Sequence, residues 1–232
     1  MAAAVSATVA CFVTKISSIQ HGRLSLFTSL GSSKDGQQMK PVIEVETERL
    51  WLRQWVPADK APFAALNADP RVMAFFPSVL TREESDAMAD RCQLLIAQRG
   101  WGLWAVELKA SGQFIGTLGL HIPSANLPFS PCVEISWRFA YPFWGQGLAT
   151  EAALAALRVG FEQLNLAEIV SFTASVNLRS QALMARIGMQ LAPTCFPHPN
   201  VSLDSPLSQH CWYRISQQQW HNRQSEQVKF GA

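Results

Sequence analysis

Hydrophobic and polar positions follow regular patterns from about residue 47 onward, and the first of these predict a strand followed by two helices. Residues 47–54 have the pattern of a strand with one buried face, in which Leu50 and Leu52 alternate with Arg49, Trp51 and Arg53. Residues 58–67 and 82–98 have the spacing of helices. The second helix starts at a capping box, because Thr81 is followed three residues later by Glu84.

The remaining pattern predicts a hairpin and then strands that alternate with helices. The helix that follows the predicted strand over residues 132–139 carries an apolar stripe at helical spacing. A later helix is capped by Asn177 and ends at Gly188. The predicted strands cover residues 103–108, 114–121, 132–139, 169–174 and 211–215. The element order β-α-α-β-β-β-α-β-α-β predicts an α+β fold in which helices flank a mixed sheet.

Composition narrows the class of protein. A chain of 232 residues fits one domain with extensions, and it contains no apolar run near the ~20 residues that a membrane span needs. A net charge of +2 without a Lys/Arg-rich run gives no reason to expect nucleic acid as a partner. The cysteines lie far apart without a C-x-x-C pair, which favours the reduced thiols of a cytoplasmic protein: Cys11, Cys92, Cys132, Cys195 and Cys211.

Residues 1–40 differ from the rest of the chain. They are rich in Ala and Ser and contain no acidic residue before Asp35. Such a segment fits either an organelle transit peptide or an upstream extension that precedes a start at Met39. We expect an N-terminal extension over 1–40, one folded domain over 41–216 and a C-terminal tail over 217–232.

The run 133–157 predicts a strand, a glycine loop and the start of a helix in direct succession. A helix N-terminus presents unpaired N–H donors and the positive end of the helix dipole. Gly145 and Gly147 lie in the loop, where the absence of a Cβ atom lets an anion approach the backbone. The segment therefore predicts an anion site of the kind that binds nucleotide phosphates.

The residues that follow the glycines separate three classes of ligand. A kinase-type phosphate loop needs Gly-Lys-Ser/Thr at this point, but Leu148, Ala149 and Thr150 follow Gly147. A dinucleotide loop needs a third small residue where Thr150 lies and an acidic residue at the end of the next strand, whereas Glu168 precedes that strand. The pyrophosphate of coenzyme A is the ligand that remains.

Two motifs resemble those of the GNAT acetyltransferase superfamily, in its branch of ribosomal-protein N-acetyltransferases. Residues 143–152 are similar to the branch's Trp-Gly-x-Gly-x-Ala-Thr-Glu-Ala loop, although Pro142 occupies the leading Gln/Arg position of the superfamily pattern. Residues 175–189 are similar to the family's Asn-x-x-Ser motif and the helix after it, with Met189 in place of Phe. Supporting elements extend the resemblance over residues 47–215.

The resemblance implies a GNAT fold with a mostly antiparallel central sheet, and acetyl-CoA as the acetyl donor without a metal ion. In this fold the strands before and after the glycine-loop helix, here residues 132–139 and 169–174, splay apart and the pantetheine arm lies between them. The residues implied to bind the cofactor come from the first strand, the loop and the second motif: Trp137, Arg138, Phe139, Trp144, Gly145, Gln146, Gly147, Leu148, Ala149, Thr150, Asn177 and Ser180.

Acetyl transfer to an amine requires a base, because an alkyl amine has a pKa near ~10 and is mostly cationic at neutral pH. Glu134 is the leading candidate, since it lies beside the cofactor gap on the polar face of its strand. A structural alternative is an ion pair between Glu134 and Arg138. His198 and His210 are alternative bases, because histidine titrates in the required range.

The departing thiolate needs a proton, and the resemblance assigns its delivery to Ser180. Asn177 and Ser180 would equally form an ordinary helix start, with Asn177 as the N-cap. A backbone N–H within residues 137–139 would stabilise the oxyanion, a role that needs no particular side chain.

Apolar side chains predict the acceptor pocket. In this superfamily the loop between the first two helices lines the pocket, so the predicted substrate-binding residues are Phe75, Phe76, Trp101 and Glu134. Trp144, beside the glycine loop, either covers the cofactor or packs in the core. These segments lack a carboxylate cluster, which argues against a polycationic acceptor.

The sequence therefore predicts an N-acetyltransferase that moves an acetyl group from acetyl-CoA to a primary amine by direct attack in a ternary complex. The acceptor is a protein N-terminus or a small molecule, and the branch resemblance favours a ribosomal protein. A catalytically silent acyl-CoA-binding module is the alternative, and the missing third glycine disfavours a dinucleotide oxidoreductase. We expect no nucleic-acid or membrane partner, and a monomer or homodimer.

Overall fold

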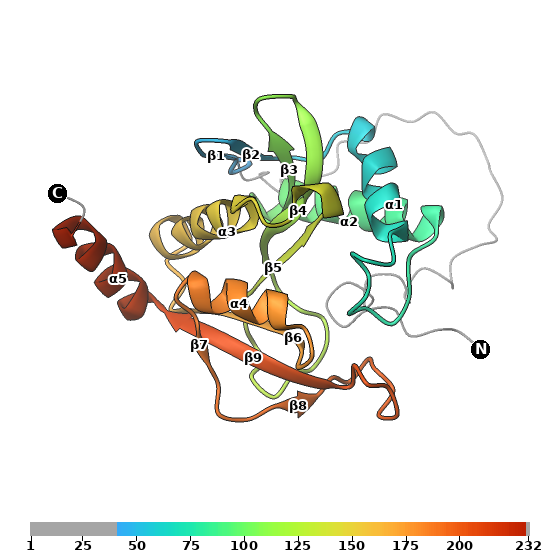
Figure 1. Ribbon diagram of the computed structural model, residues 1–232. Coiled ribbons are helices and arrows are strands. Elements are labelled where there is room, and N and C mark those ends of the chain that lie inside the picture. Colours follow the sequence, from blue (N-terminus) through green and yellow to red (C-terminus); the bar gives the residue numbers. More distant parts are fainter. Residues whose placement is uncertain (1–40, 231–232) are drawn as a thin grey trace, which may run out of the picture.

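The computed structural model describes residues 41–230, with side chains described as far as residue 226 (Figure 1). The predicted α+β fold is confirmed, and the predicted elements occur in the predicted order, as β2-α1-α2-β3-β4-β5-α3-β6-α4-β9. The structure adds three short strands, three short helical turns and a C-terminal helix. The predicted extension over residues 1–40, which includes Met39 and Cys11, lies outside the described residues.

The bounds of the elements differ from the predicted ranges by a few residues. The strands are β1 (Val45–Glu46), β2 (Leu50–Arg53), β3 (Leu103–Leu108), β4 (Gln113–His121), β5 (Glu134–Phe139), β6 (Glu168–Ala174), β7 (Gln190–Leu191), β8 (Phe196–Pro197) and β9 (Gln209–Ser216). The helices are α1 (Lys60–Ala68), α2 (Arg82–Arg99), α3 (Leu148–Arg158), α4 (Leu178–Arg186) and α5 (Gln217–Phe230). The short turns are η2 (Pro57–Asp59), η3 (Tyr141–Phe143) and η4 (Val159–Gln163), the last of which continues α3.

The strands of the described residues form one twisted sheet in the order β1-β2-β3-β4-β5-β6-β9-β7, with β8 paired to β9. Neighbouring strands are antiparallel except β5 and β6, which are parallel. The parallel pair is formed because α3 carries the chain back across the sheet between β5 and β6, as a crossover connection must. The sheet is therefore mixed and mostly antiparallel.

Strands β5 and β6 are joined at one end and part at the other. Their pairing consists of a single register pair, Glu134 with Val170. By contrast, β4 pairs with β5 along six residues and β6 pairs with β9 along seven. Beyond Glu134 the inner edges of β5 and β6 have no partner in the sheet, which opens a gap between two otherwise continuous halves.

Helices cover both faces of this sheet. Helices α1 and α2 pack together and contact β3 and β4, while α3 contacts β2, β4 and β5, and α4 contacts β6. Figure 1 shows α3 and α4 beside each other in front of the sheet and α1 towards its right-hand edge. The predicted capping box is present, since the Glu84 amide donates to Thr81 Oγ1 and the Thr81 amide donates to the Glu84 carboxylate.

Strand β2 departs from simple alternation at Arg53. Leu50 and Leu52 are buried and Trp51 is partly exposed, as expected, but Arg53 is only 8% exposed. The prediction of an exposed Arg53 is wrong because two carboxylates neutralise its charge, Asp59 at 2.8 Å and Glu107 at 2.7 Å. A buried charge is tolerated when it is paired in this way.

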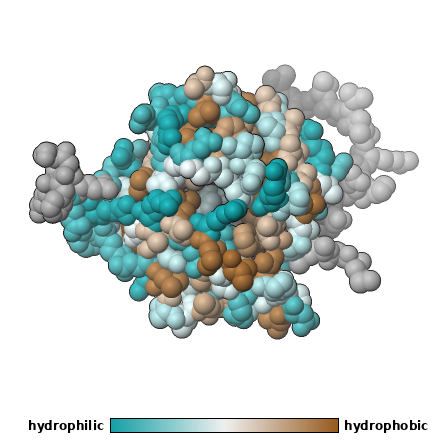
Figure 2. Space-filling view, viewed as in Figure 1, coloured by the Kyte–Doolittle hydropathy of each residue, from teal (hydrophilic) through white to brown (hydrophobic). Residues whose placement is uncertain are grey.

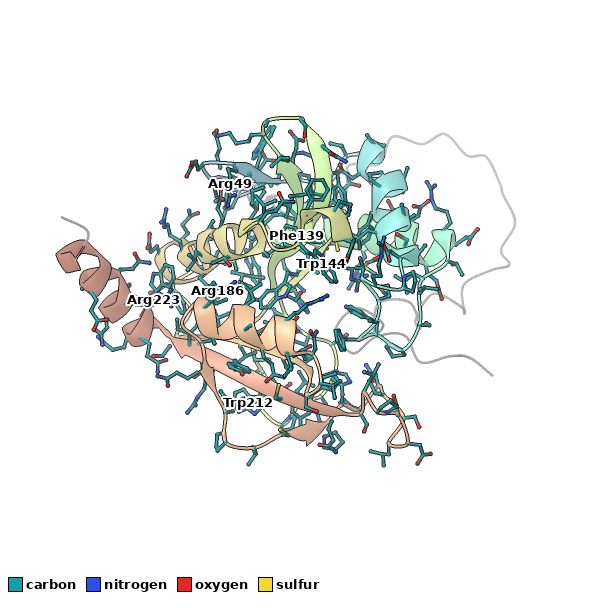
Figure 3. The ribbon with its side chains drawn as sticks, viewed as in Figure 1. Arg49, Phe139, Trp144, Arg186, Trp212 and Arg223 are labelled. Carbon is teal, nitrogen blue, oxygen red and sulfur yellow. The ribbon has the colours of Figure 1, made fainter. Side chains whose placement is uncertain are left out.

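The C-terminal segment is a helix anchored to the domain, although the sequence indicated a tail over 217–232. Trp220 of α5 is fully buried, and its ring stacks on Phe161 with 5.7 Å between ring centroids. The Arg223 guanidinium donates to the Arg186 carbonyl at the end of α4 over 2.8 Å (Figure 3). These contacts make the first turns of α5 a part of the folded unit.

Trp220→Ala is expected to destabilise the protein by about 3–5 kcal/mol, because it removes a buried indole and leaves a cavity against Phe161. Chemical denaturation would measure the change in the free energy of unfolding. Gln218→Ala, on the exposed side of the same helix, is the control and should change stability by less than about 0.5 kcal/mol. A loss below about 1 kcal/mol for Trp220→Ala would show that α5 is not packed as described.

On the face shown in Figure 2, hydrophobic residues lie among hydrophilic ones, and several of them gather below the centre of the view. Exposed apolar residues are usual on globular proteins. No helix within residues 41–230 is both long enough and apolar enough to cross a membrane. Each cysteine in the described residues is a free thiol, namely Cys92, Cys132, Cys195 and Cys211.

Candidate active site

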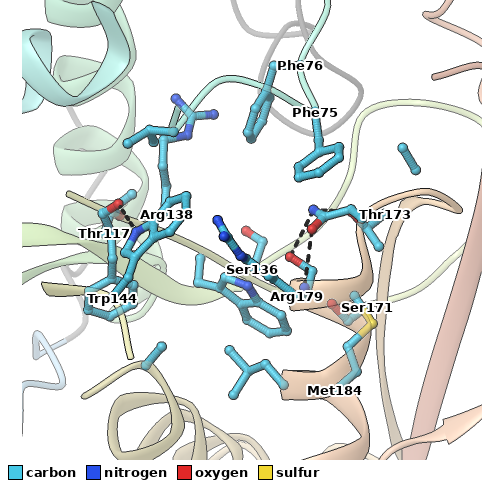
Figure 4. Close-up of a pocket in the computed structure, with 18 of the residues that line it drawn as sticks. Phe75, Phe76, Thr117, Ser136, Arg138, Trp144, Ser171, Thr173, Arg179 and Met184 are labelled. Atoms are coloured by element: carbon cyan, nitrogen blue, oxygen red, sulfur yellow. Dashed lines mark hydrogen bonds between the residues drawn. The ribbon is translucent and has the colours of Figure 1, made fainter. Parts of the chain in front are cut away.

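A cavity of about 830 Å³ lies where β5 and β6 part. Its walls come from β5, β6, the glycine loop, α4 and the loop between α1 and α2. Figure 4 shows Phe75 and Phe76 at the top of this cavity, Trp144 to the left and Thr173 to the right. Most of the residues predicted to bind acetyl-CoA or the acceptor line it: Phe75, Phe76, Glu134, Trp137, Arg138, Phe139, Trp144, Gly145, Gly147, Leu148, Ala149, Thr150, Asn177 and Ser180.

Two predicted site residues do not line the cavity. Trp101 packs against the hydrophobic core instead. The Gln146 side chain donates to the Pro142 carbonyl over 2.8 Å, and its own carbonyl accepts from Arg49 Nη1 over 3.0 Å. The side-chain amide and the backbone carbonyl of Gln146 thus both stabilise the conformation of the glycine loop.

The glycine loop has a backbone conformation that favours glycine. Gly145 has φ of 75° and Gly147 has φ of 77°, both in the left-handed region. Gly147 is the N-cap of α3, so the unpaired amides of the first helical turn follow it directly. A Cβ atom built at Gly145 would meet nothing within 4 Å, so the space beside the loop is open. This corner has the backbone donors and the room that a diphosphate needs.

The Glu151 carboxylate, in the first turn of α3, is neutralised by Arg49, which directly precedes β2. Glu151 forms an ion pair with Arg49 at 2.6 Å and accepts a hydrogen bond from Thr47 Oγ1. Burial alone would raise the pKa of Glu151, but the hydrogen bonds from Thr47 and Arg49 outweigh it and hold the pKa below its ordinary value. Because Arg49 offsets its negative charge, Glu151 does not oppose an anion at the helix N-terminus.

Backbone amides of β5 point into the gap. The Val170 amide donates to the Val133 carbonyl over 3.0 Å, so odd-numbered residues of β5 direct their polar groups towards β6. Trp137 and Phe139 lie beyond the single register pair, so β6 offers their amides no paired residue. The Phe139 carbonyl accepts a hydrogen bond from the Trp144 indole over 2.8 Å. The Trp137 amide is therefore placed where an oxyanion in the gap would need a donor.

Glu134 lies at the closed end of the gap, and its side chain is 1% exposed. It is directly opposite His121 of β4 in the sheet register, and His121 Nε2 is 3.1 Å from Glu134 Oε2. The alternative partner predicted for Glu134 was Arg138, but the Arg138 guanidinium donates to Asn67 Oδ1 of α1. The carboxylate thus lines the cavity with a buried imidazole as its neighbour.

The start of α4 forms a small polar network beside the cavity. Asn177 caps the helix, because its Oδ1 accepts from the Ser180 amide over 3.3 Å. Asn177 Nδ2 donates to Ser180 Oγ over 3.1 Å and to Thr173 Oγ1 over 2.9 Å. Because Ser180 Oγ accepts from Asn177, its hydroxyl proton is available to a further acceptor. The residues thus form a helix cap and line the cavity at the same time.

The two histidines considered as bases differ in position. His210 lines the cavity, and burial lowers its pKa, so the ring is neutral at neutral pH. His198 does not line the cavity, and its Nδ1 accepts a hydrogen bond from the Asn200 amide over 3.1 Å. Its ring centroid is 4.9 Å from that of His210, within an aromatic cluster that includes Phe172 and Phe196.

The structure adds residues that the sequence analysis did not select. His121 escaped notice because its proximity to Glu134 depends on the register of two strands. Arg179 of α4 also lines the cavity, and its guanidinium lies over the Trp144 ring, 5.0 Å from the ring centroid. Thr173 precedes the Asn177 motif by four residues, a spacing that could have indicated its contact with Asn177.

Cys92 is the cysteine among the described lining residues, and burial raises its pKa to about 12, so its thiol is protonated at neutral pH. Among residues 41–230, no group of three or more His, Cys, Asp or Glu side chains is arranged to hold a metal ion.

The chain is similar in sequence to known acetyltransferases. The family model described as an acetyltransferase (GNAT) domain matches residues 49–190. FsC-acetyl coenzyme A-N(2)-transacetylase of Aspergillus fumigatus is 30% identical to this chain over 162 residues, which cover 67% of this chain and 68% of that protein.

Solved structures share the architecture. An acetyltransferase from Agrobacterium tumefaciens str. C58 is 28% identical with a TM-score of 0.60, over 84% of this chain and 99% of that one. RimL, a ribosomal-protein alpha-N-acetyltransferase solved in complex with coenzyme A, is 17% identical with a TM-score of 0.59, over 73% of this chain and 95% of that one. At 17% identity the second likeness concerns the fold alone.

Proposed function

The chain belongs to the GNAT acetyltransferase family, and from this premise we propose that it acetylates a protein N-terminus or a small primary amine by direct attack within a ternary complex. The chain is an acetyl-CoA-dependent acyltransferase, and acetyl transfer to an amine is its reaction class. The alternative of a catalytically silent binding module is therefore not retained.

One observation carries the proposal: β5 and β6 part beyond Glu134, and the glycine loop lies at the open end of the gap. An extended donor can lie in this gap with its diphosphate on the amides that follow Gly147 and its thioester near Trp137. Binding of acetyl-CoA is supported by a solved relative that contains coenzyme A.

Glu134 is the proposed base. It removes a proton from the ammonium group of the acceptor, directly or through water, and the free amine then attacks the thioester carbon. The carbon–nitrogen bond forms while the carbonyl oxygen gains negative charge, which the Trp137 amide stabilises. His121, which is 3.1 Å from Glu134, orients the carboxylate.

Ser180 is the proposed proton donor. When the tetrahedral intermediate collapses, the carbon–sulfur bond breaks and the thiolate of coenzyme A takes the Ser180 hydroxyl proton. The new amide nitrogen releases its second proton to solvent, and solvent returns a proton to Ser180. Asn177 holds Ser180 Oγ in place for this transfer. No covalent enzyme intermediate is needed, and the high pKa of Cys92 argues against a thiolate nucleophile in the cavity.

The acceptor side of the cavity is formed by α2, β5 and the loop with Phe75 and Phe76. These apolar walls support an acceptor with apolar character next to its amine. A ribosomal protein N-terminus is one candidate within this class, suggested by the loop motif and by the fold shared with RimL. The A. fumigatus relative, named as a transacetylase of FsC, supports a small-molecule acceptor equally.

A thiol-release assay tests the proposal. Purified protein with acetyl-CoA is expected to release free coenzyme A in the presence of at least one class of primary amine, chosen from amino acids, short peptides and small amines. Mass spectrometry of the product should show one added acetyl group on the acceptor nitrogen. Binding of acetyl-CoA without thiol release from any class of amine would contradict the proposal.

A further inference from the structure

Arg138 is a buried cation in the cavity wall without a carboxylate partner in the described part of the chain. Arg138 is 6% exposed and lines the cavity. One nitrogen, Nη1, donates to the uncharged Asn67 Oδ1, while Nε is buried without a hydrogen-bond partner among the described residues. The guanidinium group has five N–H donors, so residues 41–230 use only part of its hydrogen-bonding capacity.

The contrast with Arg53 shows how unusual this environment is. Arg53 is buried to a similar degree, but it has ion pairs with Asp59 and Glu107, and the hydrogen bonds that it donates to Asp59 are the chief cause of its raised pKa. Burial instead lowers the pKa of Arg138 to about 10. An unpaired buried charge is costly, and a fold can retain it where a ligand supplies the opposite charge.

Arg138 faces the acceptor side of the cavity. Side chains two residues apart on a strand share a face, so Glu134, Ser136 and Arg138 project together. That face is directed to α1 and α2, because Arg138 contacts Asn67 of α1 and its guanidinium lies 4.2 Å from the Phe76 ring. Figure 4 shows Arg138 and Phe76 on the same upper side of the cavity.

The cofactor does not account for this charge. The diphosphate corner lies at the N-terminus of α3. The Arg138 guanidinium instead contacts Asn67 of α1 and the Phe76 ring. The cation is therefore available to the acceptor.

We propose that the acceptor carries a carboxylate in addition to its amine, and that Arg138 binds this carboxylate. The inference rests on the proposed function, because it names the class of acceptor for the same site. Glu134 and Arg138 are four residues apart, which is roughly 13 Å between their Cα atoms at ~3.3 Å per residue. A short peptide or an ω-amino carboxylate can thus place its amine near Glu134 and its carboxylate at Arg138. A polycation is disfavoured by the same charge.

Matched acceptors test the inference. The assay is coenzyme A release with ω-amino carboxylates from glycine to 6-aminohexanoate and with glycyl dipeptides, each compared with its carboxamide. At the preferred length, kcat/KM for the carboxylate should exceed that of the amide by about 30-fold or more, the size expected for a buried charge pair. Arg138→Gln should reduce this ratio to about one, whereas Arg138→Lys should retain part of it.

Two controls accompany the variants. Arg82→Gln changes an exposed arginine of α2 that pairs with Asp86 outside the cavity, and it should leave the carboxylate-to-amide ratio unchanged. Arg138→Gln is expected to fold, because glutamine can still donate to Asn67 and the substitution removes an unneutralised buried charge. Circular dichroism and acetyl-CoA binding would check the folding of this variant. If it is unfolded, the carboxylate-to-amide ratios of the wild type and of Arg138→Lys test the inference.

The outcomes separate the inference from the proposed function. Equal or better reaction of the amides would overturn the carboxylate inference while the acetyltransferase proposal stands. Acetyl-CoA binding without reaction of any carboxylate in the series, while other amines react, would also overturn it. Failure of every amine to release coenzyme A would instead contradict the proposed function, and the inference with it.

Discussion

Gly147→Glu is expected to weaken acetyl-CoA binding by about a hundredfold or more, which corresponds to about 2.7 kcal/mol. The new carboxylate would lie at the N-terminus of α3, in the place of the phosphate oxygens. Gly147 also has φ of 77°, so any side chain adds backbone strain at the point where the amides must be aligned. Isothermal titration calorimetry with acetyl-CoA would measure the change in the dissociation constant.

Two further variants separate charge from strain. Gly112→Glu introduces the same side chain at a glycine with φ of 67° in the β3–β4 turn, outside the cavity lining, and should leave binding unchanged. Gly147→Ala adds strain without charge, and should weaken binding less than Gly147→Glu does. A Cβ atom at Gly147 would be 3.5 Å from Arg49 Nη2, so an ion pair with Arg49 is the way a glutamate could be tolerated. Unchanged affinity in Gly147→Glu would refute the assignment of this loop to the diphosphate.

Glu134→Gln should lower kcat by about 10²–10⁴-fold, the usual contribution of a general base, with little change in acetyl-CoA affinity. Glutamine has the same shape and can still contact His121, so the loss would report the missing proton acceptor. The dependence of kcat on pH should also flatten on the acid side, where protonation of the carboxylate no longer limits the rate. Steady-state kinetics over a pH series, together with calorimetry, would measure both effects.

Glu168→Gln provides the matched control for this substitution. Glu168 begins β6, is exposed, pairs with Arg214 at 3.7 Å and does not line the cavity. Its substitution should leave kcat and the pH profile unchanged. Normal turnover in Glu134→Gln would move the search for the base to His210, which lines the same cavity with a lowered pKa.

Local features of the fold could be predicted from the sequence, because they depend on residues close together in the chain. The capping box of Thr81 and Glu84 and the N-cap at Asn177 each involve groups three residues apart, and both are present. The strand, glycine loop and helix around Gly147 were also predictable. Glycine is required there by the left-handed backbone, and the amides of α3 follow from the helix itself.

Contacts between distant segments could not be predicted in this way. His121 and Glu134 meet because β4 and β5 pair in one register, and a shift of one residue would place their side chains on opposite faces. Trp101 was expected in the acceptor pocket and packs on the core instead. The helix α5 was missed because it depends on burial of a single residue, Trp220, against Phe161.

The sequence by itself determined the order of the elements, the glycine loop before α3 and the glutamate on the strand that precedes this loop, since periodicity, capping and backbone conformation are set by near neighbours. Only the tertiary structure decided that β5 and β6 share one register pair before they part. It also decided that Arg53 is neutralised while Arg138 is not. The free energy of a buried charge depends on which groups the rest of the fold places beside it. Those groups come from distant segments of the chain, so a local sequence pattern does not predict them.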